Sequence, residues 1–508
     1  MYGFKHLFVA VLSVSAMTIA HARDTYNIDT NQLSIPSVIV NDVRYSDVVI
    51  TVDQVISVGT TSSGVEDIYN PLKNQLSIPS VTVGTKVYYD VVVSVGKVLA
   101  VGPSTPVNVT KLVDTYSVAR RPLVTMVPAS FVKGIRHIVV SGYDNTRTLF
   151  NRDAPVKIYQ INIDGSSLDV TKSILGREHL ATTNYPLIAD FNNDGIDDIF
   201  MAGFDDSPED QTSVAFISRP GQNHRRVDLP NKTWSHSSAV IDVNKDGYLD
   251  VVNQHGQMWI NDGQGNFQFR HHSYDYNTSN GLWMHGSGVC TGDFNNTGRS
   301  QIVITDLSVD ANTAPISDTV IFELNSSMIP VASHTLPMPV LDRNVTKETS
   351  HDVGCVAVDL NNDGRLDLLV FSRPDYSARS NTWTNEGTVQ VLINRGNWVF
   401  EDITDRAMAK YPTNTLISYT PMITDLNGDG KPDLWMGYFD FDTGKANHAW
   451  LNNGSGAFTR SLQSTIDSFG SNGPMVPIKF GNTYSFVYSK MTGNQLSIYA
   501  TNSRYIFN

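Results

Sequence analysis

Cysteines, basic residues and long apolar runs are all scarce in this sequence. Only Cys290 and Cys355 occur among 508 residues, so no cysteine lies near the N-terminus, where a lipid anchor would be attached. The 37 Lys and Arg residues are outnumbered by 50 Asp and Glu residues, and the formal net charge of −13 argues against nucleic acid as a partner. No segment approaches the roughly 20 consecutive apolar residues of a transmembrane helix.

The first residues are typical of a signal peptide. Lys5 precedes an apolar run over residues 7–19, and an Ala-His-Ala sequence at 20–22 is followed by Arg23. We therefore expect residues 1–22 to be removed and the mature protein to be secreted or held at the cell surface.

Residues 23–112 contain a repeat with a period of 43, formed by residues 31–59 and 74–102. Alternating Val and Ile positions predict short antiparallel strands in each copy. This N-terminal β-repeat module is interpreted as a spacer that mounts the rest of the chain. The alternative is that its exposed strand edges pair with another chain.

A second, nine-residue pattern organises residues 113–508. Four copies share the order Asp-x-Asn-x-Asp-Gly-x-x-Asp and begin at Asp190, Asp242, Asp359 and Asp425. A fifth copy, which begins at Asp293, has Thr297 and Gln301 where the others have Asp. Successive first Asp residues are separated by 52, 51, 66 and 66 residues, which is the range of one supersecondary unit per repeat.

Short apolar runs precede and follow each copy, so the pattern is interpreted as a hairpin loop between two strands. A third strand and a Gly-containing turn follow, which predicts four antiparallel strands per repeat, the plan of a propeller blade. Residues 128–143 align with 189–204 without the acidic residues, and residues 474–488 supply a last degenerate unit. The count is then seven, although periodicity alone also allows six or eight blades.

These repeats resemble FG-GAP/VCBS repeats, the units of the integrin α-subunit head and of many bacterial exported proteins. The resemblance covers about residues 113–508 and implies an all-β fold, a seven-bladed β-propeller of four-stranded antiparallel blades.

The nine-residue loops are predicted to bind Ca²⁺, at about four sites. Positions one, three, five and nine offer side-chain oxygens and position seven a backbone carbonyl, which suits a hard cation that takes six to eight oxygen ligands. An EF-hand also shares this spacing, but its acidic ligand at position twelve and its following helix are missing. We expect the degenerate loop at Asp293 to be empty or weak. The predicted ligands are Asp190, Asn192, Asp194, Ile196, Asp198, Asp242, Asn244, Asp246, Tyr248, Asp250, Asp359, Asn361, Asp363, Arg365, Asp367, Asp425, Asn427, Asp429, Lys431 and Asp433.

The metal loops of FG-GAP propellers lie on one face and the ligand-facing loops on the other. Transferred to this chain, that topology places the loops before each first strand on the ligand face, because successive strands alternate direction. Aromatic rings can stack on sugars there, and imidazoles can hydrogen-bond to hydroxyl groups. The candidate ligand residues are Trp234, His236, Trp283, His285 and His351, with Tyr376, Trp383 and Tyr438 in the long loops between second and third strands, which are expected on the same face.

The sequence favours an extracellular binding or adhesion module for a glycan or a surface or matrix protein. A polysaccharide-acting, lyase-like enzyme and a structural component of a surface assembly remain alternatives; no nucleophile motif or zinc spacing supports the enzyme.

Cys290 lies three residues before Asp293, whereas Cys355 lies four residues before Asp359. This one-residue offset should point them to opposite strand faces, and we expect two buried free thiols.

Overall fold

The protein is described here by a computed structural model of two compact units, Met1–Val109 and Thr110–Asn508. No helix among the described residues is long and apolar enough to cross a membrane. The described residues are 24–40, 43–61, 66–101, 104–106, 110–117, 123–143, 156–177, 186–202, 212–232, 235, 237–270, 286–307, 318–338, 350–374, 388–408, 421–436, 448–471, 473–503 and 505–507.

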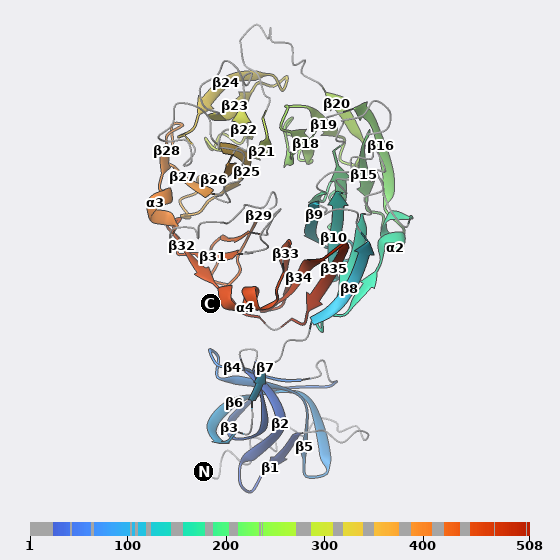
Figure 1. Cartoon of the computed structure of the whole chain (residues 1–508), viewed down its shortest axis with the longest axis vertical. Helices are drawn as coiled ribbons and strands as arrows, with labels where there is room; N and C mark the ends of the chain where they lie inside the picture. The colour runs from blue at the N-terminus through green and yellow to red at the C-terminus, as the bar shows by residue number, and fades with distance from the viewer. Residues whose placement is uncertain are drawn as a thin grey trace. The chain divides into compact units, whose positions relative to one another are not determined.

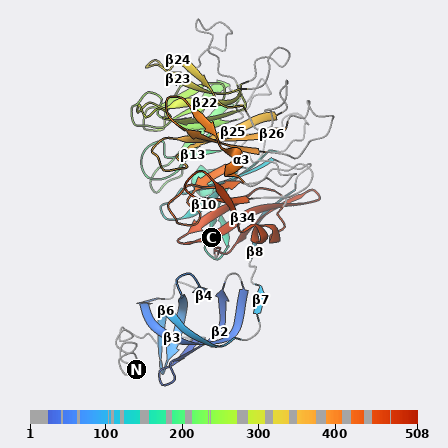
Figure 2. The same cartoon turned by 90° about the vertical axis from the view of Figure 1, so that its left-hand side faces the viewer.

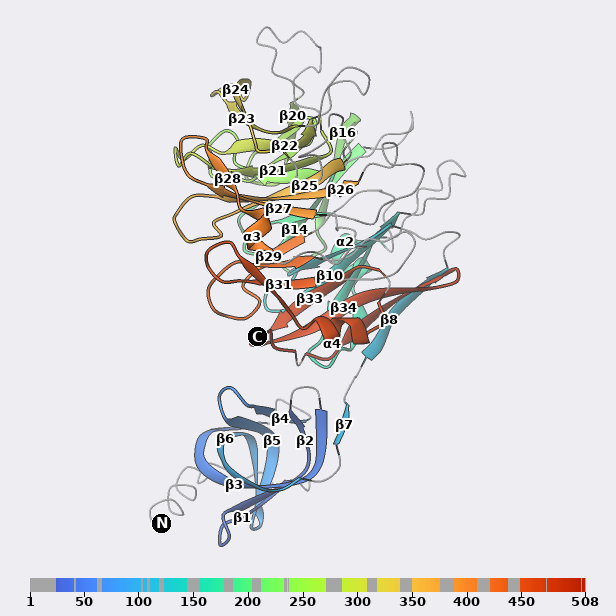
Figure 3. The same cartoon turned by 60° about the vertical axis from the view of Figure 1, so that its left-hand side comes forward.

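The N-terminal unit is a small closed barrel in which β2, β4, β5, β6 and β3 pair in a ring (Figures 2 and 3). The first repeat supplies β1 (Asp24–Asn27), β2 (Gln32–Val40) and β3 (Val43–Gly59). The second supplies β4 (Asp67–Asn70), β5 (Gln75–Val83) and β6 (Lys86–Ala100), and β7 (Ser104–Pro106) adds to β3. Each element of the second repeat begins 43 residues after its counterpart, so the period seen in the sequence becomes a pseudo-two-fold barrel.

The barrel closes because the short first strand of each repeat pairs with the other repeat. β1 runs parallel to β5, and β4 runs parallel to β2, while β3 and β6 pair antiparallel. Alternate residues then point inward, and Leu33 and its counterpart Leu76 are almost completely buried together.

The larger unit consists of seven four-stranded antiparallel sheets arranged in a ring, which Figure 1 shows in chain order. Blade 1 contains β9 (Leu123–Ala129), β10 (Arg136–Tyr143), β11 (Lys157–Ile161) and β12 (Ser167–Asp169). Blade 2 contains β13 (Leu187–Ala189), β14 (Asp198–Met201), β15 (Thr212–Ile217) and β16 (Arg225–Lys232). Blade 3 contains β17 (Ser238–Ile241), β18 (Asp250–Asn253), β19 (Met258–Asn261) and β20 (Phe267–Arg270).

Blade 4 contains β21 (Gly288–Gly292), β22 (Gln301–Leu307), β23 (Asp318–Leu324) and β24 (Pro330–Thr335). Blade 5 contains β25 (Ser350–Val358), β26 (Asp367–Pro374), β27 (Thr388–Asn394) and β28 (Phe400–Asp402). Blade 6 contains β29 (Pro421–Thr424), β30 (Asp433–Met436), β31 (His448–Asn452) and β32 (Phe458–Ser461). Short helices follow the outer strands of blades 1, 5 and 6: α2 (Thr171–Leu175), α3 (Thr404–Ala407) and α4 (Gln463–Ser468).

Blade 7 combines both ends of the propeller. Its strands β33 (Met475–Phe480), β34 (Thr483–Thr492) and β35 (Gln495–Thr501) are completed by β8 (Thr110–Ser117), which pairs antiparallel with β35. Tyr159 of blade 1 donates a hydrogen bond to Asp114 on β8, and the ammonium of Lys111 lies 2.8 Å from a carboxylate oxygen of Asp164. The ring is thus closed by a strand from the beginning of the unit, which the sequence pattern did not reveal.

Neighbouring blades pack face to face, and their apolar side chains form shared cores. Leu369 and Val391 of blade 5, for example, are buried with Leu434 and Trp450 of blade 6. This arrangement, with the barrel, confirms the predicted all-β fold and the count of seven blades.

The expectation of two free thiols is wrong, because a disulfide joins Cys290 and Cys355, with 5.6 Å between their Cα atoms. The offset in register does point the two side chains to opposite faces of their own blades. Adjacent blades meet with opposite faces, however, so the offset brings the cysteines together in one core shared by blades 4 and 5. The strands pass so closely that a Cβ on Gly288 would lie 2.6 Å from the Cα of Gly354.

Candidate calcium loops and central channel

The four acidic loops connect the first and second strands of blades 2, 3, 5 and 6. Because the strands of a blade alternate in direction, these loops share one end of the propeller with the turns between third and fourth strands. The acidic loops and these turns both lie along the left-hand side of the propeller in Figure 3.

Each acidic loop is shaped by its own side chains. In the loop of blade 3, the Asp242 carboxylate accepts hydrogen bonds from the backbone N–H groups of Asp246 (3.1 Å) and Gly247 (3.0 Å). Asn244 also accepts from the Asp246 N–H, and Asp246 accepts from the Tyr248 N–H. The sixth residue has a positive φ of 81–87° in all four loops, a conformation that glycine adopts without strain. The same contacts recur in the other three loops.

The ninth residue of each loop is a completely buried aspartate. Asp250 accepts the Val243 N–H at 3.0 Å and the Asn261 N–H at 2.8 Å, and so ties the loop to the third strand. Burial raises the pKa of Asp198, Asp250 and Asp367 to about 6, and it also raises the pKa of Asp433. Loss of water disfavours the charged form of these carboxyl groups, and a bound cation would favour it.

An asparagine at the end of the third strand connects neighbouring blades. The side-chain N–H of Asn261 donates to the Phe191 carbonyl in the loop of the preceding blade at 2.7 Å. Asn394 and Asn452 donate in the same way to the carbonyls of Phe294 and Leu360, each at 2.8 Å. Their common position at the third-strand turn is visible in the sequence, but their reach to another blade is not.

The donor set of the four loops fits calcium chemistry. The first, fifth and ninth positions offer carboxylates, the third an amide oxygen and the seventh the carbonyls of Ile196, Tyr248, Arg365 and Lys431. Within the described ranges, however, no group of three or more His, Cys, Asp or Glu side chains converges closely enough to hold a metal. The carboxylates instead hydrogen-bond to the backbone, and Lys431 pairs with Asp429 at 3.0 Å.

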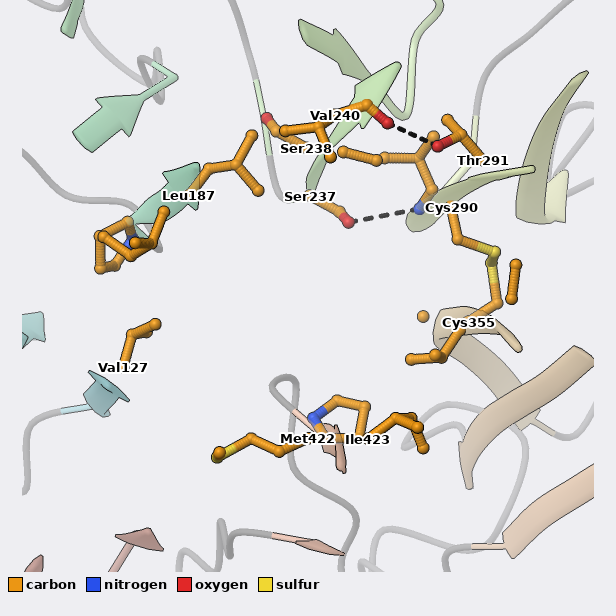
Figure 4. Close-up of a pocket in the computed structure, with 18 of the residues that line it drawn as sticks. Val127, Leu187, Ser237, Ser238, Val240, Cys290, Thr291, Cys355, Met422 and Ile423 are labelled. Atoms are coloured by element: carbon orange, nitrogen blue, oxygen red, sulfur yellow. Dashed lines mark hydrogen bonds between the residues drawn. A yellow bond between two sulfur atoms is a disulfide. The ribbon is translucent and has the colours of Figure 1, made fainter. Parts of the chain in front are cut away.

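The centre of the ring contains a cavity of about 680 Å³, lined mostly by the first strands of blades 1 to 6 (Figure 4). Asp197 is the one charged residue among its described lining residues, and its carboxylate accepts the Ser130 N–H at 2.5 Å. Thr291 donates to the Val240 carbonyl, and Ser237 accepts the Val289 N–H, so these hydroxyl groups join adjacent first strands. The Cys290–Cys355 disulfide also lines this central cavity, which we call the central channel.

Most of the candidate ligand residues cannot be placed. Trp234, His236, Trp283 and His285 lie outside the described residues, as do Tyr376, Trp383 and Tyr438. His351 belongs to β25, where its backbone pairs with Arg373.

Comparison with known proteins identifies the repeats. Residues 190–253 and 359–436 match the FG-GAP-like repeat model. These two segments of the propeller are FG-GAP-like repeats. The matched segments contain all four acidic loops, so the predicted repeat type is confirmed. No curated protein matches the chain.

One solved structure that resembles the chain is the crystal structure of the V. cholerae biofilm matrix protein Bap1. The match covers 78% of this chain and 71% of that chain, with 12% sequence identity and a TM-score of 0.33.

Proposed function

We propose that the protein is an exported binding module, a calcium-stabilised FG-GAP-like propeller that recognises an extracellular glycan or protein. The observation that carries this proposal is the gathering of four equivalent oxygen-rich loops at one end of a closed ring. Those loops would stabilise the propeller by binding calcium. The loops that precede the first strands, at the opposite end, would then bind the ligand.

Calcium is assigned a structural role. In the part of the chain that the structure describes, backbone N–H groups donate to the buried Asp198 and Asp250, together with the Ser218 hydroxyl at Asp198, and no cationic side chain is among these partners. A dication at each loop would offset the cost of keeping these carboxylates ionised. Extracellular modules hold calcium with Kd values of about 10⁻⁴–10⁻³ M, so millimolar calcium would contribute on the order of 1 kcal/mol per site.

The recognition surface is proposed to lie at the channel mouth away from the calcium loops, around Trp234, His236, Trp283, His285 and His351. The described channel lining has one carboxylate and is otherwise uncharged, which favours a neutral ligand such as a glycan over a highly charged one. The N-terminal barrel is proposed to act as a spacer.

The test is a glycan and matrix-protein array probed with the full chain, with and without calcium. Replacing Trp283 and His285 by Ala should abolish binding of the ligand found, with calcium content and Tm nearly unchanged. The matched control replaces Trp398 and His334, whose rings stack at 3.9 Å between blades 4 and 5, and it should keep ligand binding. Undiminished binding by the first variant would refute this site and direct attention to segments 372–387 and 438–447.

A further inference from the structure

The fifth loop, Asp293–Gln301 in blade 4, has the backbone of the acidic loops without their acids. Asp293 accepts the N–H groups of Thr297 at 2.9 Å and Gly298 at 2.5 Å, as the first aspartate does elsewhere. Asn296 and Gly298 have φ values of 54° and 70°, close to those at the same positions of blade 3. The loop therefore folds with one carboxylate where the others have three.

Gln301 takes the ninth position and is 2% exposed. Its side-chain oxygen accepts the Phe294 N–H at 2.7 Å, just as Asp250 accepts the Val243 N–H. Its amide N–H groups donate to the side-chain oxygen of Asn295 at 3.1 Å and to the Arg299 carbonyl at 2.5 Å. The partners fix the orientation of the amide, because a backbone N–H can only donate and a carbonyl can only accept.

The two acceptors of the Gln301 amide are the third and seventh positions of the loop. In the acidic loops, these positions supply an amide oxygen and a carbonyl oxygen to the predicted calcium site. The positive end of the Gln301 side chain thus contacts the oxygens that a cation would contact.

We propose that the Gln301 amide replaces the cation in blade 4, so that this loop is closed by hydrogen bonds and does not bind calcium. The proposal rests on the calcium role proposed for the other four loops. A dication here would have to displace the amide, which would leave buried N–H groups without partners beside a single carboxylate. The donor set of this loop does not fit calcium.

The hydrogen-bonded loop of blade 4, closed by Gln301, lies where several bonds join blades 4 and 5. Asn296 donates to the Gly364 carbonyl of the blade 5 loop at 3.0 Å, and Asn394 of blade 5 donates to Phe294 at 2.8 Å. The Cys290–Cys355 disulfide joins the first strands of the same two blades. Calcium removal should therefore leave the blade 4 loop closed.

The experiment compares calcium content and Tm of the full chain in CaCl₂ and in chelator. Gln301→Ala should keep the wild-type calcium content and lower Tm by roughly 1–4 °C equally in both conditions. The matched control, Asp250→Ala in blade 3, should lose one ion and lower Tm more in calcium than in chelator. The double variant Thr297→Asp/Gln301→Asp should gain one ion, with a Tm that falls in chelator and recovers with calcium.

Loss of an ion from Gln301→Ala would overturn the proposal, because Gln301 would then be a ligand. So would a double variant that gains no ion while Asp250→Ala loses one. If chelator changes no Tm and no variant changes calcium content, the calcium role of the other loops fails. An equal loss of stability by Gln301→Ala in both conditions would still support closure of the blade 4 loop by the Gln301 hydrogen bonds.

Discussion

The disulfide between blades 4 and 5 allows the stability of the ring to be tested quantitatively. Its cysteines are separated by 65 residues, and a cross-link over a loop of that length removes denatured-state entropy worth about 4 kcal/mol. An unfolding entropy of roughly 2 cal/mol/K per residue in a unit of about 400 residues converts this into a Tm loss of roughly 5 °C.

The assay is the Tm of the Cys290→Ala/Cys355→Ala variant against wild type, measured without reductant. Both cysteines are buried, so loss of packing adds to the entropic effect, and reduced wild-type protein separates the two contributions. Thiol titration of the denatured, unreduced protein should find no free sulfhydryl. Two titratable thiols per chain, or a wild-type Tm that reductant does not change, would refute the reasoning.

Three further variants and one chelation experiment test the loops and the ring closure. Replacing Asp359 and Asp363 together by Ala should remove one calcium ion and leave about three, whereas unchanged metal content would mean that this loop holds none. Chelation of calcium from the wild type should lower Tm by roughly 5 °C. Asn261→Leu should cost about 1–3 kcal/mol in urea unfolding, since the Phe191 carbonyl loses its partner, and an unchanged midpoint would show that the link between blades is dispensable. Tyr159→Phe should cost a similar amount, about 1–3 kcal/mol, because Asp114 on the closing strand loses a buried donor, and equal stability would count against this closure contact.

The sequence alone determined the features that depend on local pattern. Short apolar runs on either side of an Asp-x-Asn-x-Asp-Gly loop specify a hairpin, because strand propensity and turn chemistry act over fewer than ten residues. Repetition of this unit, with its degenerate copies at 128–143 and 474–488, predicted an all-β propeller, and the resemblance to FG-GAP/VCBS repeats settled the expected count at seven rather than six or eight blades. The 43-residue period likewise predicted the strands of the N-terminal module.

The tertiary structure decided which distant groups meet. The cysteine offset indicates opposite faces within a blade, and only face-to-face packing of blades 4 and 5 turns that offset into a disulfide. Closure by β8 and the reach of Asn261 to the preceding blade are also set by packing. Such contacts join residues whose separation in sequence carries no periodic signal, so they emerge only when the ring has closed.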